Sequence, residues 1–267
     1  TLGATRVSAD KAYSNYFLSQ SGFPTITGDV FFTSSFANAI LSDKTPEAAL
    51  VYARDTLTFP VVVKPNSSSQ GRLVTFATDE ATLLQAIEQI SQIDRAFLVQ
   101  RIVVGKDYRI LVVDDQVLCA YERRAIEVHG DGVHTIDELL ADKISLLKTE
   151  NRDIHFSVSD FRIDAKLARA GLDRFSILKP MESYRILDNC NLSAGGEAVD
   201  VTDSIHASYR EIAIAIAKAM GQRFCGVDLM VQGDITKLHC PQNSYVVLEV
   251  NAAPGVMQFA HTSDRAK

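Results

Sequence analysis

The chain has 267 residues, of which 46% are apolar and 22% charged, and its formal net charge at pH 7 is −6. This length allows a large hydrophobic core, in one domain or two closely associated ones, and the negative charge argues against a nucleic-acid partner, which would require a basic surface. No apolar run approaches the roughly 18 residues of a membrane span and no signal peptide is visible, so we expect a cytoplasmic protein with no membrane partner.

The cysteines and histidines show no spacing typical of a disulfide framework or a zinc site. The six histidines lack zinc-ligand spacing. We expect reduced thiols, because no CxxC pair occurs among Cys119, Cys190, Cys225 and Cys240.

The first patterned segment is a predicted helix from Asp10 to Gly22, with the glycine at its end. It places Lys11 in the first turn, where the helix dipole disfavours a cation, so this lysine is either simply solvated or has a binding role. Next, Phe59 to Lys64 is a predicted strand, followed by a loop of small residues at 65–72. A lysine that ends a strand and the N–H groups of such a loop can bind phosphates; the loop is not a Walker sequence, and an ordinary hairpin turn is the alternative.

A predicted strand–helix–strand unit includes this strand. Thr78 or Asp79 caps an amphipathic helix, and 96–100 is the next strand. We expect one side of this helix to carry Leu83, Leu84, Ile87 and Ile90. The alternating segments 107–113 and 116–121 then form a hairpin, in which Asp107 and Arg109 share a face and could simply form an ion pair with each other.

The second half of the chain contains two more predicted helices and a loop of small residues. Thr135 to Glu138 is a capping box that begins a helix to about residue 148, and 204–221 is an amphipathic helix that ends at a glycine. The segment 151–183 is mixed in pattern. In the loop 189–197, the paired Gly195 and Gly196 suit a backbone that approaches a ligand closely, with a plain long turn as the alternative.

The last two predicted strands, 225–231 and 245–251, carry polar groups that a buried strand normally excludes. Glu249 and Asn251 are two residues apart and therefore point to one face, and Asp228 lies on the neighbouring strand. Oxygen ligands of this kind suit Mg²⁺, which usually keeps several waters and shares substrate phosphates. The three residues are therefore a candidate magnesium site.

Taken together, these segments resemble the ATP-grasp carboxylate–amine ligases, and more closely the ATP-grasp regions of cyanophycin synthetases and fused bacterial glutathione synthetases. The similarity follows the family's order from residue 10 to 255: FPVVVKP at 59–65, GKDYRILVV at 105–113, GDGVHTI at 130–136, NLSAGG at 191–196, DVTD at 200–203, GVD at 226–228 and EVNAAPG at 249–255. A single motif of this kind is weak evidence, whereas the ordered set is specific.

The resemblance implies a nucleotide site. Lys11 and Lys64 correspond to the lysines that contact the α- and β-phosphates of ATP. The nearby phosphate loop contributes Ser69 and Gly71. The adenine hinge corresponds to Gln100, Arg101 and Val103, and the ribose-binding acid corresponds to Asp107.

The resemblance also implies the metal and catalytic groups. The magnesium ligands, which would also accept Mn²⁺, correspond to Asp228, Glu249 and Asn251. The groups that face the nucleotide, the acyl phosphate or the transferred phosphate correspond to Arg109, one of Arg123 and Arg124 with Arg124 as the candidate, Asn191, Gly195 and Gly196.

Three positions depart from the family pattern. The hinge usually begins with Glu and here begins with Gln100, and Leu73 stands where relatives often have a second glycine in the phosphate loop. Close relatives also have an arginine just before the NLSAGG segment, where this chain has the sequence 187–190 (LDNC).

The implied fold class is α+β, an ATP-grasp fold in which a small strand–helix–strand lid at 58–103 covers a larger antiparallel-sheet core at 104–267. The core would carry a helical insertion at about 135–183, and 1–57 would supply an N-terminal helix and a linker. A preceding substrate domain would be an expected partner, and a homo-oligomer is compatible with the sequence.

The implied reaction is ATP-dependent amide formation between a carboxylate of an amino acid or peptide and an amine, through an acyl phosphate, with release of ADP and phosphate. The alternatives are a glutathione-type small-peptide synthetase, a non-catalytic ATP-binding module of a larger protein, and a metal-binding module without a nucleotide.

Overall fold

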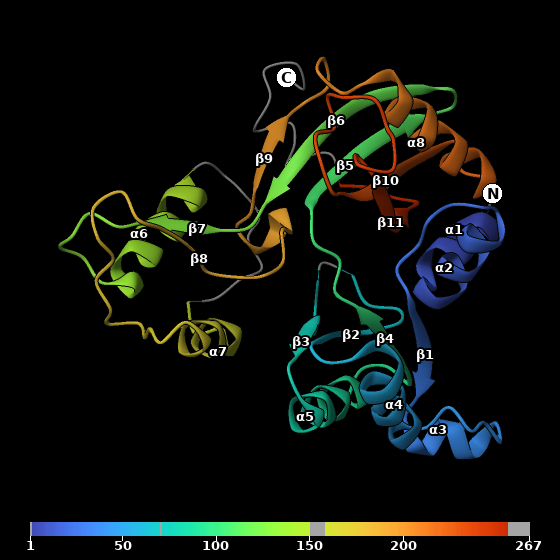
Figure 1. Cartoon of the computed structure of the whole chain (residues 1–267), viewed down its shortest axis with the longest axis horizontal. Helices are drawn as coiled ribbons and strands as arrows, with labels where there is room; N and C mark the ends of the chain where they lie inside the picture. Colours follow the sequence, from blue (N-terminus) through green and yellow to red (C-terminus); the bar gives the residue numbers. More distant parts are fainter. Residues whose placement is uncertain (1, 70, 150–157, 256–267) are drawn as a thin grey trace. The chain divides into compact units, whose positions relative to one another are not determined.

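The computed structural model describes residues 2–69, 71–149 and 158–255, which form two units that are each described by themselves (Figure 1). Of the described residues, those within 2–120 and 202–254 form the first unit, and those within 121–201 together with Gly255 form the second. Gln70 of the expected phosphate loop and residues 150–157 of the expected helical insertion lie outside the described residues.

The first unit contains a four-stranded antiparallel sheet with the strand order β1-β4-β2-β3. Its strands are β1 (Gly28–Phe32), β2 (Val61–Pro65), β3 (Thr75–Ala77) and β4 (Ala96–Arg101). The expected strands at 59–64 and 96–100 are confirmed as β2 and β4. The lid boundaries at 58 and 103 remain a prediction, and the sheet itself extends on its N-terminal side to β1.

Helices cover one face of this sheet (Figure 1). They are α4 (Pro46–Tyr52), the π-helical turn η1 (Ala53–Leu57) and α5 (Glu80–Ser91); the short helix α3 (Ser34–Ala39) connects β1 to α4. Side chains of α4, η1 and α5 share one apolar core with the odd-numbered residues of the strands, Phe31, Val61, Val63, Phe97 and Val99. Because strand side chains alternate, the even-numbered residues of β2 and β4 point to the opposite face.

Helix α5 begins and packs largely as its sequence predicts. Asp79 is the N-cap and forms a capping box with Thr82. Leu83 and Ile90 are fully buried, but the prediction was wrong for Leu84, which is 46% exposed. A helix turns by about 100° per residue, so residue 84 lies away from the face shared by residues 83, 87 and 90.

The first unit also contains the strands that carry the candidate metal ligands. Strands β5 (Lys106–Val113), β10 (Phe224–Val231) and β11 (Tyr245–Asn251) are antiparallel, and β6 (Gln116–Arg124) follows β5 in the order β11-β10-β5-β6. Helix α8 (Ala207–Ala219) contacts β5 and β10, while α1 (Leu2–Ala9) and α2 (Lys11–Gln20) contact β11.

The second unit begins within β6, whose C-terminal part pairs with β9 (Glu197–Asp200). Strands β7 (Glu127–His129) and β8 (Ser183–Arg185) form a separate pair. Helices α6 (Ile136–Thr149) and α7 (Phe161–Arg169) and the 3₁₀ turn η2 (Leu192–Ala194) complete the unit. Its apolar core includes Ile126, Leu140, Ile163 and Ile186, all fully buried.

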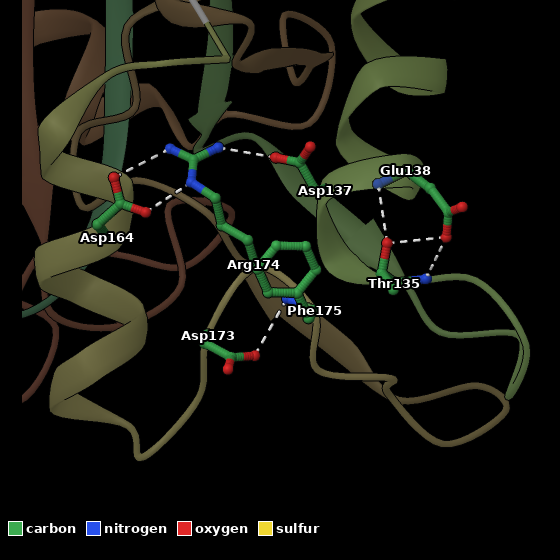
Figure 2. Close-up of polar contacts among 7 residues, drawn as sticks. All are labelled: Thr135, Asp137, Glu138, Asp164, Asp173, Arg174 and Phe175. Atoms are coloured by element: carbon green, nitrogen blue, oxygen red, sulfur yellow. Dashed lines mark hydrogen bonds and ion pairs between the residues drawn. The ribbon is translucent and has the colours of Figure 1, made fainter.

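Two polar arrangements stabilise the helices of the second unit (Figure 2). The predicted capping box is confirmed, because Thr135 N donates to Glu138 Oε2 over 2.8 Å and Glu138 N donates to Thr135 Oγ1 over 3.3 Å. Arg174 donates to Asp137 on α6 and to Asp164 on α7, so a single guanidinium joins the two helices.

Several observations complete the comparison with the sequence. The sequence did not predict α1, α3, α4 or β1. In the part of the chain described, no helix combines the length and apolar character needed to cross a membrane. No disulfide links any of the four cysteines.

Candidate active site

The β10–β11 pair brings the three candidate metal ligands to one face. Asp228 lies opposite Glu249 and Gly226 lies opposite Asn251, with a shift of register directly after Asp228. Opposed residues on neighbouring strands point to the same face, so the two carboxylates and the amide converge. Asn251 Nδ2 also donates to Asp228 Oδ2 over 3.3 Å. The expected convergence is observed, and the role as metal ligands stays a prediction.

Arg109 is bound to the buried carboxylate of Asp228. The two residues are opposed on β5 and β10. Arg109 Nε donates to Asp228 Oδ1 over 2.7 Å, and Nη2 donates to Oδ2 over 2.6 Å. The sequence suggested Asp107 as an ion-pair partner of Arg109 and did not suggest Asp228. Asp107 lies two residues before Arg109 on the same face of β5 and is half-buried.

Lys64 and Lys11, the two candidate phosphate ligands, lie close enough to interact electrostatically. The pKa of Lys64 is lowered to about 8: burial has the largest effect, the charge of Glu249 raises the pKa, and the charge of Lys11 lowers it. Lys11 donates through Nζ to the carbonyl oxygen of Ser68. Within the described residues, Lys64 makes no hydrogen bond, so its charge is available to an anion.

A small pocket with polar and apolar lining residues lies beside Lys11, between α1, α2 and β11. Its lining includes Lys11, Ser14 and Asn15 from the first two turns of α2 and Glu249 from β11. One candidate phosphate ligand and one candidate metal ligand therefore line the same pocket, although they are far apart in the sequence.

The loop after β2 forms the hairpin to β3, as the alternative reading of the sequence suggested. Asn66 fixes it to the start of α2, because its backbone oxygen accepts from Lys11 N over 3.3 Å and its side-chain oxygen accepts from Ala12 N over 2.9 Å. Ser69 is exposed, and Gly71 has a φ of +69°. Leu73 has a φ of +55°, so it adopts the left-handed backbone for which a glycine is usual. The loop is thus attached to Lys11 at two points, Asn66 and Ser68.

The hinge segment contains a buried polar group, the side-chain amide of Gln100. Gln100 is 2% exposed, and within the described residues its Oε1 accepts no hydrogen bond. In register, Gln100 lies opposite Val62 of β2, and Lys64 lies opposite Leu98 of β4, so Gln100 and Lys64 point to the same face, away from the core under α4 and α5. A buried acceptor of this kind requires a donor to offset its desolvation.

Two other hinge positions have no comparable feature. Arg101 is exposed, and its backbone N donates to Thr27 O over 2.8 Å. Val103 is half-buried and follows the end of β4. Their backbone groups remain candidates for contacts with adenine.

The remaining candidate residues lie in the second unit. Arg124 donates through Nε to Glu122 Oε1 over 2.9 Å and through Nη2 to Oε2 over 3.2 Å. The loop that follows Asn191 is a tight turn, in which Asn191 O accepts from Ala194 N over 3.0 Å and from Gly196 N over 3.2 Å.

Both glycines of this loop are required by its geometry. Gly195 has a φ of +80°. A Cβ on Gly196 would lie 2.6 Å from the backbone oxygen of Arg124 and 2.9 Å from that of Asn191. The structure therefore brings the backbone of Arg124, at the end of β6, next to the turn that contains Asn191, Gly195 and Gly196.

Two residues that sequence reasoning missed contribute to the site. Gly28 lies opposite Gln100, but β1 was not recognised, and a lone glycine gives no signal by itself. Asn66 was part of the quoted loop, but its contacts with the start of α2 depend on tertiary structure, which the sequence pattern does not reveal.

The donor set fits a magnesium ion that is held jointly with phosphates. Within the described residues no group of three or more His, Cys, Asp or Glu side chains is suited to hold a metal ion. Asp228 and Glu249 supply two carboxylates, and Asn251 adds an amide oxygen. Mg²⁺ typically binds to one or two carboxylates and completes its shell with water and substrate phosphates.

Comparison with known proteins places these residues in a wider context. Residues 8–175 and 182–265 match the model of the RimK-like ATP-grasp domain. The glutathione biosynthesis bifunctional protein GshAB of Enterococcus faecalis is 31% identical over 253 residues, which cover 92% of this chain and 32% of that protein. The cyanophycin synthetase of Geminocystis herdmanii is 31% identical over 258 residues, covering 93% of this chain and 28% of the relative.

A solved structure gives a consistent picture. The bifunctional glutathione synthetase of Pasteurella multocida is similar with a TM-score of 0.55 and 27% identity, covering 96% of this chain and 34% of that one. The chain therefore spans about a third of the length of the relatives that it matches.

Proposed function

The chain belongs to the RimK-like ATP-grasp family, and from that premise we propose that it is an ATP-dependent ligase that joins a carboxylate to an amine in an amide bond. The carboxylate attacks the γ-phosphate of ATP to give an acyl phosphate and ADP. An amine then attacks the acyl carbon, and phosphate leaves. Phosphoryl transfer of this kind needs positioning and charge neutralisation more than a protein nucleophile.

One observation supports the nucleotide assignment: Lys64 and Gln100 lie on the same face of β2 and β4, opposite the core under α4 and α5. Burial disfavours the charge of Lys64, and within the described residues Oε1 of Gln100 accepts no hydrogen bond. The ammonium of Lys64 suits a phosphate. The buried Oε1 of Gln100 suits an exocyclic amine of the kind that adenine carries. A nucleotide with its base at β4 and its phosphates near the end of β2 would supply both groups.

Other residues of the first unit extend this site. Lys11 is fixed to the phosphate loop through Ser68, so its charge and that of Lys64 would act on the same phosphates. Asp107 is our candidate for the ribose hydroxyls, because it lies on the face of β5 that also carries Arg109. The backbone of Arg101 and Val103 would hold the edge of the base.

Asp228, Glu249 and Asn251 are the proposed ligands of Mg²⁺, and Mn²⁺ would suit the same oxygens. When bound, the metal would neutralise charge on the β- and γ-phosphates. The protein's own contribution is to keep two carboxylates and an amide on one face through the register of β10 and β11.

The second unit is proposed to contact the reacting phosphate. The turn from Asn191 to Gly196 would lie beside the anion, and Arg124, whose backbone oxygen is close to Gly196, would supply a positive charge. This part of the proposal stands on the turn geometry and on the family resemblance.

The substrates are proposed only as a class. Relatives named for glutathione biosynthesis and as cyanophycin synthetase suggest amino-acid or peptide substrates. A glutathione-type small-peptide synthetase is the narrower alternative, because seven similar relatives are named as glutathione biosynthesis bifunctional proteins, including those of Enterococcus faecalis and Streptococcus thermophilus.

The test is MgATP-dependent release of ADP with a panel of amino acids and dipeptides as carboxylates and amines, followed by mass detection of the amide. We expect ADP and an amide in equal amounts with at least one pair. The Glu249→Gln variant should lose turnover by orders of magnitude, whereas Glu80→Gln, on the exposed side of α5, should retain it. Tight ATP binding with no ADP release for any pair would instead favour a non-catalytic ATP-binding module.

A further inference from the structure

Arg109 occupies both carboxylate oxygens of Asp228. Its Nε and Nη2 lie 2.7 and 2.6 Å from Oδ1 and Oδ2, and Asn251 donates a third hydrogen bond to Oδ2. The side chain of Asp228 is 4% exposed and that of Arg109 is 17% exposed. A carboxylate removed from water this far needs a close positive charge, and Arg109 supplies it.

The fold holds Arg109 in this position. Arg109 and Asp228 are direct neighbours across β5 and β10, and Arg109 runs past Gly226, two residues before Asp228. A Cβ on Gly226 would lie 3.4 Å from Cδ and Nε of Arg109 and 3.0 Å from Cβ of Pro254. Arg109 therefore packs beside the backbone of Gly226, and the register of β5 and β10 builds the pair into the sheet.

The same carboxylate is one of the proposed metal ligands, so this inference rests on the proposed function. A divalent cation on Asp228 would lie within a few ångströms of the guanidinium, and two positive charges at that distance repel strongly where water is excluded. The cation and Arg109 therefore compete for one carboxylate.

We propose that Arg109 acts as an internal cation that suppresses metal binding at Asp228 until a nucleotide is present. Phosphates supply negative charge to both partners: they complete the shell of the metal, and they offer the guanidinium an anion that it binds well. Metal and nucleotide then bind with positive coupling, and by reciprocity each raises the affinity for the other. Arg109 is the residue that sets the size of this coupling.

The chain contains a matched control. Arg223 binds Asp114 in the same two-point geometry, with Nε to Oδ1 at 2.6 Å and Nη2 to Oδ2 at 3.0 Å. Arg223 is 87% exposed, and Asp114 lies in the turn between β5 and β6 rather than among the candidate metal ligands. Removal of Arg223 changes the net charge as removal of Arg109 does, but it leaves Asp228 untouched.

The experiment measures binding of Mn²⁺ by the electron paramagnetic resonance signal of free Mn²⁺, without nucleotide and with saturating ADP. Without nucleotide, Arg109→Met should bind Mn²⁺ at least about tenfold more tightly than the unmodified protein, as close charge pairs of this kind allow. Arg223→Met should match the unmodified protein. With ADP, the advantage of Arg109→Met should shrink or reverse.

A second variant protects the test against misfolding. Arg109→Met leaves Asp228 buried without its cation, so its circular dichroism spectrum is checked first. Arg109→Lys retains a positive charge but loses the two-point geometry, and it should bind Mn²⁺ with an affinity between those of the other two proteins. If neither folded variant binds Mn²⁺ more tightly than the unmodified protein without nucleotide, the competition does not exist.

The outcomes separate this inference from the proposed function. Mn²⁺ binding in the presence of ADP by the unmodified protein, with no gain in the Arg109 variants, rejects the competition and leaves the metal site standing. No Mn²⁺ binding to any of the proteins, even with ADP, rejects the metal site and the competition together.

Discussion

Gly28 lies directly opposite Gln100 across the β1–β4 pair, and no side chain larger than hydrogen fits at Gly28. A Cβ there would lie 2.5 Å from the backbone oxygen of Val99 and 2.6 Å from Cγ of Gln100. The position of the buried amide is therefore set by a glycine on the neighbouring strand. Strand β1, which the sequence pattern did not reveal, is therefore in contact with Gln100, the candidate base-binding residue.

Gly28→Ala should weaken nucleotide binding and destabilise the protein. The backbone oxygen of Val99 cannot move without a shift of the strand pair, and overpacking of this kind costs about 1–3 kcal/mol in free energy of unfolding. Urea denaturation measures the stability, and titration calorimetry with MgATP measures the affinity. Gly3→Ala is the control, because its Cβ meets nothing within 4 Å. Unchanged ATP affinity in Gly28→Ala would show that Gln100 does not contact the base.

Gln100→Met should have opposite effects on stability and on ATP affinity. It removes a buried acceptor that has no partner in the described structure, so the free energy of unfolding should stay equal or rise. It also removes the proposed contact with adenine, which should raise the Kd for ATP about tenfold. Gln100→Glu retains an acceptor and should lose less affinity. A Met variant that is less stable and binds ATP normally would point to a purely structural role.

Affinity for ATP should fall as the pH rises through about 8. Burial lowers the pKa of Lys64 to about 8, so above that pH its ammonium loses the charge that the phosphates need. The unfolded chain holds this proton to a higher pH, so the ligand-free protein should become more stable over the same alkaline range. Calorimetric titrations over a pH series test the affinity. Lys64→Arg, which stays charged, should remove most of the pH dependence; an identical profile would exclude Lys64 as its source.

Gly196→Ala should reduce turnover and leave ATP binding nearly unchanged. Its Cβ would lie 2.6 Å from the backbone oxygen of Arg124, so the turn that begins at Asn191 must shift. Small displacements of groups around a reacting phosphate can lower turnover about 100-fold. Steady-state release of ADP, compared with Gly3→Ala, measures the effect. Normal turnover would show that the turn does not contact the reacting group.

Arg174→Met should destabilise the second unit without a change in ATP affinity. Arg174 donates to Asp137 and Asp164 and thereby joins α6 to α7 (Figure 2). Its partners are partly exposed, so solvent screening limits the loss to about 1 kcal/mol. Arg54→Met, which breaks more exposed pairs with Asp55 and Glu80, should cost less. Equal urea midpoints for Arg174→Met and Arg54→Met would show that the contacts of Arg174 between α6 and α7 add no stability.

The contact between Arg174 and Asp164 should also make the stability of the protein depend on pH in the acidic range. The hydrogen bond from Arg174 lowers the pKa of Asp164, so its contribution is present above the usual pKa of an aspartate and is lost as the pH falls further. The stability difference between the unmodified protein and Arg174→Met should therefore shrink in acid.

The sequence predicted the parts of the fold that have strong local signals. The capping box at Thr135, the cap at Asp79 and the strands around Asp228 and Glu249 all depend on patterns within a few residues, and all are present. The resemblance to ATP-grasp ligases is confirmed by the match of the family model over most of the chain. By contrast, β1 and α1 were missed because a short half-buried strand and a helix with few apolar residues have little periodicity.

The sequence predicted which residues belong to the candidate site, but not which residues they contact. Strand parity placed Glu249 and Asn251 on one face without a structure. It could not show that Arg109 binds Asp228, because that pair is 119 residues apart and depends on how β5 and β10 are aligned. Nor could it show that Oε1 of Gln100 is buried and accepts no hydrogen bond from the described residues, since burial is a property of the folded chain.

Ligands that bind at Lys64 and Gln100 can be detected from the melting temperature of the protein itself. A compound that binds only the folded state raises the melting temperature by an amount set by its concentration relative to Kd. An adenine nucleotide brings an anion to the buried ammonium of Lys64 and a hydrogen-bond donor to the buried Oε1 of Gln100. Adenine nucleotides should therefore raise the melting temperature more than phosphate or adenosine alone. With ADP present, carboxylates and amines can then be ranked by melting temperature alone, and an unknown substrate pair can be sought before any product has been identified.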